Sequence, residues 1–289
     1  MNPIRPPKFR PRLAGKLGCS ALTTRAYPQA YPDPMKFRAL CTLLACGVGS
    51  LIAVEAPTAK AEPIPKKGFG LPERKGMDAT HLDLLKVGWY YNWGDRTKLT
   101  THAQFVPMVF SGRREPPPNR VPFLLGFNEP DHAKQANMSP AAALEKWPAL
   151  VAQSQTLIAP ALAGNPLKSE WLAAFLKATP KVDAIAVHWY KGADSAKFIK
   201  DLEEIHARFQ KPLWVTEFAP QTTADSAEHP TKFTQAQVNT FIAETTAFME
   251  KTPWVERYAW HHSGVGTSAL FTKDGQLTET GKAYASVKK

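Results

Sequence analysis

Two glutamates in this chain each stand at the end of a short apolar segment. Glu129 follows residues 123–127 and Asn128, and Glu217 ends the segment 213–217. A parallel strand buried on both faces gives such an apolar run, and a carboxylate is costly to bury, so each glutamate is expected at the mouth of its strand or in a pair. Most glycoside hydrolases use two carboxyl groups that flank the bond they cleave. The sequence predicts such a pair if both strands belong to one sheet or barrel.

Other polar and aromatic side chains are expected at the same strand ends. Aromatic rings stack on the apolar faces of sugars, and the chain has eight tryptophans. Two of these, Trp89 and Trp214, are predicted to be core residues, and a buried structural role also remains open for His188 and Tyr190. The predicted substrate-binding residues are Asn92, Trp93, Asn128, His188, Trp189, Tyr190 and Trp260.

The elements that must position these residues alternate between strand and helix. Apolar runs of strand character cover residues 66–71, 87–93, 105–110, 123–127, 156–160, 183–190, 213–217 and 255–261. Helical segments cover residues 79–85, 141–155, 170–178, 196–209, 235–250 and 281–287, and the second of them has Ser139 as its N-cap and Pro140 at its first position. Eight strands separated mostly by helices predict an α/β fold, a small single-domain (β/α)₈ TIM barrel with its active groups at the carboxyl ends of the strands. A doubly wound sheet is the competing fold.

The first 61 residues predict export. Residues 1–34 are rich in Pro, Arg and Lys and are interpreted as a non-native extension before a true start at Met35. Residues 35–61 have the basic start, short apolar stretch and Ala-x-Ala site of a signal peptide, which leaves 62–289 as the catalytic domain. We therefore expect a secreted or periplasmic protein. A single membrane anchor and a lipoprotein acylated at Cys46 are the alternatives.

Composition excludes several classes of function for residues 62–289. The three cysteines are Cys19, Cys41 and Cys46, so a disulfide, a zinc-thiolate site or a cysteine nucleophile is excluded there. The formal net charge is +11, but residues 1–61 hold nine Lys and Arg against two Asp and Glu, which leaves +4 for the rest. Because Lys and Arg are spread along the chain rather than clustered, nucleic acid is not an expected partner. We expect a monomer, with no membrane contact beyond the leader.

Five motifs in the same order resemble one family, the glycosyl hydrolase catalytic core, glycoside hydrolase family 128. They are GFNEPD at 126–131, VHWY at 187–190, WVTEF at 214–218, YAW at 258–260 and WYYNW at 89–93. The resemblance implies a small barrel of the retaining clan that acts on β-1,3-glucan. His261 and His262, and the loops 111–122 and 220–230, depart from the family pattern and leave the sugar subsites open.

The resemblance also implies roles for individual residues. Glu129 matches the acid/base and Glu217 the nucleophile, while Asn128 matches the residue that binds the 2-hydroxyl of the cleaved sugar. His188 and Tyr190 would orient the nucleophile. Trp260 would form the floor under the cleaved sugar.

Three alternatives remain open at this stage. The same machinery could act on another β-glycan, such as mannan, cellulose or mixed-linkage glucan. A catalytically silent glycan-binding barrel would keep the tryptophans and could lose a carboxylate, although both carboxylates are present here. A metal-dependent deacetylase or esterase is the third, but the His261–His262 pair lacks the helical His-x-x-x-His or mixed carboxylate spacing of a metal site. We expect neither a metal nor a cofactor.

Overall fold

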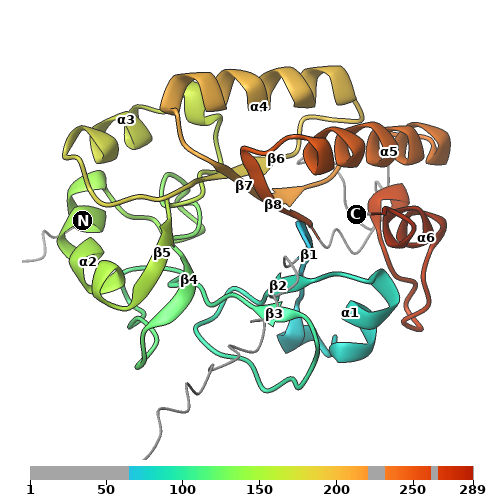
Figure 1. The fold of residues 1–289 in the computed structure, drawn as a ribbon, viewed down its shortest axis with the longest axis horizontal. Coiled ribbons are helices and arrows are strands. Elements are labelled where there is room, and N and C mark those ends of the chain that lie inside the picture. Colours follow the sequence, from blue (N-terminus) through green and yellow to red (C-terminus); the bar gives the residue numbers. More distant parts are fainter. Residues whose placement is uncertain (1–64, 221–231, 262–265, 289) are drawn as a thin grey trace, which may run out of the picture. The chain divides into compact units, whose positions relative to one another are not determined.

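The computed structural model describes residues 65–220, 232–261 and 266–288 (Figure 1). The predicted extension, the signal peptide and Cys46 lie outside the described residues, as do His262 and nearly all of the loop 220–230. The described strands are β1 (Lys67–Gly70), β2 (Trp89–Tyr91), β3 (Gln104–Phe105), β4 (Val121–Leu125), β5 (Ser154–Ile158), β6 (Ile185–Trp189), β7 (Leu213–Phe218) and β8 (Val255–Trp260).

These strands form a closed parallel ring. Six are paired in the order β3-β2-β1-β8-β7-β6, and β4 pairs with β5. Parallel bridges from Met108 to Leu125 and from Ile158 to Ala184 join the two groups, so β4 and β5 fill the gap between β3 and β6. In Figure 1 the strands surround the centre and the helices lie around their outside. The predicted TIM-barrel-like fold is confirmed.

Helices follow most strands and cover the outer face of the ring. They are α1 (Ala79–Leu85), α2 (Pro140–Ala152), α3 (Glu170–Lys177), α4 (Ser195–Phe209), α5 (Gln235–Lys251) and α6 (Glu279–Ala285), with single 3₁₀ turns η1 (Glu73–Lys75), η2 (Pro166–Lys168) and η3 (Gly266–Ser268). Helix α2 begins as predicted, because the Ser139 side chain accepts a hydrogen bond from the Ala142 amide and Pro140 occupies the first turn. None of the described helices is long and apolar enough to cross a membrane.

The third strand is shorter than the predicted segment 105–110. Regular pairing in β3 stops at Phe105, because Pro107 has no amide hydrogen to donate to a ladder. The chain returns to the ring at Met108, and the Leu125 amide donates to the Pro107 carbonyl over 2.9 Å. Between Met108 and Val121, all of it described, the chain forms turns instead of a helix.

Side chains along the strands alternate between two hydrophobic clusters, as the two-residue period of a strand requires. Trp89, Trp214 and Ala259 belong to the cluster inside the ring. Their strand neighbours Tyr90 and Tyr258 belong to the larger cluster between the strands and the helices. Strands β1, β2, β6 and β7 are therefore buried on both faces, which explains their near-continuous apolar runs. The prediction of Trp89 and Trp214 as core residues is confirmed, since both are fully buried.

Candidate active site

A cleft opens at the carboxyl ends of the strands, where a barrel places its functional groups. Its volume is about 730 Å³, and residues at or beyond the carboxyl ends of seven of the eight strands line it. We call it the central cleft. Six of the predicted site residues line it: Asn92, Trp93, Asn128, Glu129, Tyr190 and Glu217.

Glu217, on β7, is the most heavily hydrogen-bonded group in the cleft. Its Oε1 accepts from the Tyr91 hydroxyl at 3.1 Å and from the Trp93 indole at 2.9 Å. Its Oε2 accepts a short bond from the Tyr190 hydroxyl and lies 3.4 Å from Nδ1 of His188. A carboxylate offers about four lone-pair positions, and hydrogen bonds from Tyr91, Trp93 and Tyr190 take three of them.

This environment favours the ionised form of Glu217. Burial alone would raise the pKa of the carboxyl, because its residue is only 5% exposed. The charges of His188 and His261, followed by the hydrogen bonds from Tyr190 and Trp93, act in the opposite direction and prevail. The pKa of Glu217 therefore lies below its usual value, and the group is a carboxylate at neutral pH.

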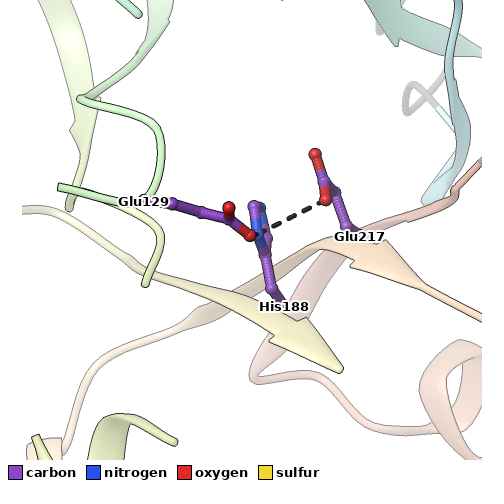
Figure 2. Close-up of side chains that lie close together, drawn as sticks. All are labelled: Glu129, His188 and Glu217. Carbon is purple, nitrogen blue, oxygen red and sulfur yellow. Dashed lines mark hydrogen bonds and ion pairs between the residues drawn. The ribbon is translucent and has the colours of Figure 1, made fainter. Parts of the chain in front are cut away.

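Glu129 faces Glu217 across His188 (Figure 2). Its Oε1 lies 2.9 Å from Nδ1 of His188, and this is the single side-chain partner of its carboxyl group among the described residues. Burial lowers the pKa of the fully enclosed His188 imidazole, but the charge of Glu217 and the hydrogen bond and charge of Glu129 outweigh it, so the pKa is raised. Two carboxyl groups and one imidazole thus lie together in one cluster.

Backbone geometry at the strand ends is strained where the functional side chains enter the cleft. Glu129 has φ of 46° and Trp93 has φ of 58°, the left-handed region that side chains other than glycine rarely adopt. Such conformations persist where surrounding structure enforces them, and they concentrate at functional sites. The amide of Glu129 donates to the Ala161 carbonyl at 2.7 Å, which anchors this turn to the chain after β5.

The two predicted asparagines are held differently. Asn92 donates to the Glu73 carboxylate at 2.6 Å and to the Arg96 carbonyl at 2.9 Å, so its amide group is engaged in the cleft wall. Asn128 is 3% exposed, and its side-chain oxygen has no hydrogen-bond partner within the described residues. A buried polar atom without a partner is costly. This amide is therefore a candidate to form a hydrogen bond with a ligand in the cleft.

The structure contradicts the predicted substrate contacts of Trp189 and Trp260. The Trp189 indole packs on Phe198 of α4 and donates to Asp201 of the same helix at 2.9 Å. Trp260 is fully buried, and its indole donates to the Ser268 carbonyl at 3.0 Å. Both predictions are wrong because adjacent strand residues point to opposite faces, so both rings lie behind the strands and not in the central cleft.

Two residues of the cluster escaped sequence reasoning. The sequence gives Tyr91 no role of its own, yet its hydroxyl reaches Glu217 from β2. His261 was noted as a departure from a family pattern, and the structure places its Nε2 4.0 Å from Oε2 of Glu217, edge-on to Trp93 and Tyr190. Alternation along β2 and β8 is the signal that could have found them, since Trp89 and Ala259 face inward two residues earlier.

Glu129, His188 and Glu217 also form the one group in the described chain whose ligand atoms, all within 4.8 Å of one another, could surround a metal ion. The donor set fits a cation poorly. Tyr91 and Trp93 donate hydrogen bonds to one oxygen of Glu217, and Tyr190 donates to the other. A metal ion would have to displace these donors to bind the carboxylate. The cluster is better suited to proton transfer and carboxylate chemistry.

The Tyr190 hydroxyl is expected to hold the pKa of Glu217 down. In Tyr190→Phe, the carboxylate loses one of the hydrogen bonds that oppose its burial, so Glu217 should titrate at a higher pH than in the wild type. NMR titration of labelled glutamate carboxyl carbons measures this directly. Tyr90→Phe is the control, because that hydroxyl bonds Thr97 and not Glu217. An unchanged Glu217 titration in Tyr190→Phe would contradict the assigned contact.

The chain is similar in sequence to a known protein family and to a curated protein. A family model described as the glycosyl hydrolase catalytic core matches residues 68–284. The curated alkali-sensitive linkage protein 1 of Schizosaccharomyces pombe is 30% identical over an alignment of 227 residues, and the alignment covers 69% of this chain. The match spans only 40% of that relative's length.

Solved structures resemble the chain over most of its length. One is a GH128 subgroup I endo-β-1,3-glucanase variant from Amycolatopsis mediterranei in complex with laminaritriose and laminaribiose, with 30% identity and a TM-score of 0.66 over 76% of this chain and 98% of that one. Another is a GH128 subgroup V exo-β-1,3-glucanase from Cryptococcus neoformans, with 25% identity and a TM-score of 0.64 over 76% of this chain and 98% of that one.

Proposed function

The chain belongs to the glycosyl hydrolase catalytic core family, and on this premise we propose that it is a retaining endo-β-1,3-glucanase. The observation that carries the proposal is the close approach of two carboxyl groups in the central cleft. One oxygen of Glu129, one of Glu217 and a nitrogen of His188 lie within 4.8 Å of one another. Retaining glycosidases hold their carboxyl groups about 5–5.5 Å apart, whereas inverting enzymes leave roughly 6.5–9.5 Å for a water molecule.

The unequal surroundings of the two glutamates support a division of labour. Glu217 receives three hydrogen-bond donors and has a lowered pKa, which suits a nucleophile that must be ionised. Glu129 has one side-chain partner, His188, within the described residues, which leaves its second oxygen available to a glycosidic oxygen in the cleft. Environments that differ in this way separate an acid from a nucleophile in carboxylate pairs.

The reaction then proceeds in two balanced steps. In the first, a Glu217 oxygen bonds to the anomeric carbon, the bond from that carbon to the leaving oxygen breaks, and Glu129 transfers its proton to that oxygen. In the second, water bonds to the same carbon, Glu129 takes a proton from the water, and the ester to Glu217 breaks. Two inversions give net retention. The amide of Asn128 is proposed to bind the 2-hydroxyl of the sugar that reacts.

The substrate class follows from the similar solved structures. The Amycolatopsis relative is an endo-β-1,3-glucanase that holds laminari-oligosaccharides, and the chain aligns with nearly all of it. The exo-acting relative shows that chain-end cleavage also occurs on this framework, so the endo mode belongs to the proposal. We further propose that the leader at residues 35–61 exports the enzyme, because the polymer is too large to reach it inside a cell.

Product analysis on laminarin oligosaccharides tests the proposal. We expect NMR to show the β-anomer as the first product, before mutarotation mixes the anomers. Internal cleavage of a hexasaccharide labelled at its reducing end should give labelled products of several lengths. An initial α-anomer would overturn the retaining mechanism, and release of single terminal sugars would replace the endo mode with an exo mode. If the protein bound laminarin and released no product, it would be a catalytically silent glycan-binding barrel and not an enzyme.

A further inference from the structure

The wall of the central cleft carries three cationic side chains that the chemistry at the carboxyl pair does not use. Arg74 and Lys75 belong to η1, which follows β1, and Arg114 lies in the segment between β3 and β4. All three residues line the cleft and are exposed. None of their side chains forms an ion pair or a hydrogen bond within the ranges that the structure describes.

Two carboxylates that share a pocket lining with Arg74 and Arg114 already have other partners. Glu73 accepts from the Asn92 side chain at 2.6 Å and from the Thr97 hydroxyl at 3.0 Å. Asp95 is paired with Arg96, whose guanidinium lies 2.7 Å from it. These two acids stabilise the loop after β2. The charge of Arg114 also helps to lower the pKa of Asp95, after the hydrogen bond from Arg96 as the main cause. Neither acid forms a direct ion pair with Arg74, Lys75 or Arg114 among the described residues.

The carboxylates deeper in the cleft do not balance the three cations either. Glu217 and Glu129 share His188, whose raised pKa favours its charged form. The charge of Lys75 nevertheless reaches this region. Burial is the main cause that lowers the pKa of His261, and the positive charge of Lys75 adds to that lowering. The wall of the cleft therefore has an excess of positive charge. The negative charges of Glu129 and Glu217 are largely offset by His188 between them.

We propose that the cleft accepts β-glucan chains that carry an anionic substituent, with Arg74, Lys75 and Arg114 as its receptor. A neutral glucan offers only hydroxyl groups, whereas a carboxylate or phosphate ester can replace water around two guanidinium groups and an ammonium. The assignment rests on the proposed function, because it names the substrate that the same cleft prefers. Clefts lined by one sign of charge also concentrate ligands of the opposite sign and speed their association.

The test compares lightly carboxymethylated laminarin with unmodified laminarin. The variant replaces Arg74, Lys75 and Arg114 together by Gln, and Lys273→Gln serves as the control because that exposed lysine lies in a turn away from the cleft. We expect the ratio of kcat/KM on the anionic substrate to kcat/KM on the neutral one to fall on the order of tenfold in the triple variant, the combined scale of three exposed ion pairs. The control should keep the wild-type ratio, and added salt should reduce it in the wild type.

Calorimetric titration with carboxymethylated and plain laminari-oligosaccharides separates this inference from the proposed function. Tighter binding of the anionic ligand that is lost in the triple variant supports the inference, even for a protein that hydrolyses neither polymer. Equal binding of the two ligands by the wild type, or a preference that survives in the triple variant, overturns it. Failure to cleave unmodified laminarin counts against the proposed function instead.

Discussion

Glu217→Gln is expected to abolish laminarin hydrolysis while the barrel stays folded. The amide cannot form the glycosyl ester, so turnover should fall on the order of 10⁴- to 10⁶-fold, the scale seen when other hydrolases lose their nucleophile. The substitution keeps the size of the side chain in a position where the residue is 5% exposed. Initial rates of reducing-sugar release measure the effect, and circular dichroism with thermal unfolding verifies the fold.

Glu203→Gln is the matched control for this variant. Glu203 is an exposed carboxylate on α4, outside the central cleft, so its loss removes the same charge from the molecule without touching the site. Its activity should equal that of the wild type. Added azide should restore part of the activity of a smaller, Glu217→Ala variant by direct attack on the anomeric carbon. Near-wild-type turnover in Glu217→Gln would refute the nucleophile.

Glu129→Gln is expected to cost about 10²- to 10⁴-fold on laminarin, the usual contribution of a general acid and base. The glutamine can neither donate the proton that the leaving oxygen needs nor accept one from water. An aryl β-laminaribioside with a dinitrophenol leaving group needs no proton, so its first bond cleavage should be nearly unaffected. A burst of phenol followed by slow release of the sugar, monitored by stopped-flow absorbance, would reveal the accumulated ester.

The difference between these two substitutions is what identifies the acid/base. If Glu129→Gln lost as much activity on the aryl substrate as on laminarin, and no burst occurred, the acid role would be refuted. A loss confined to the first step would instead indicate an acid that does not serve as base. Exogenous azide distinguishes these outcomes, because it attacks the glycosyl ester without base catalysis and should accelerate the second step in Glu129→Gln.

Much of this site could be predicted from strand patterns, because a buried parallel strand leaves a clear apolar run with a carboxylate at its end. Glu129 and Glu217 were found in this way, and the structure places both in one cleft. The predictions that failed concern orientation. Val187 and Trp189 both pack outside the ring, whereas His188 between them points at the carboxyl pair. The sequence contains this alternation, and applying it strictly would have excluded Trp189.

Alternation alone does not explain Glu217. Trp214 faces the inside of the ring, so a regular strand would direct the side chain three residues later outward. Val215 and Phe218 both pack outside, although they are also three residues apart, and the pairing of β7 with β8 shifts register between them. This irregularity turns Glu217 into the cleft. Bulges near active sites redirect side chains in this way, and no residue pattern in the segment reveals it.

The sequence by itself determined the eight strands, their order and the two glutamates that follow or end the fourth and seventh, since local hydrophobicity and the cost of a buried charge depend on neighbouring residues. Only the tertiary structure decided which groups surround them. Tyr91 and Trp93 reach Glu217 from more than 120 residues away, and His188 stands between the two carboxyl groups. Closure of the ring brings these side chains together, and closure depends on contacts that no single segment encodes.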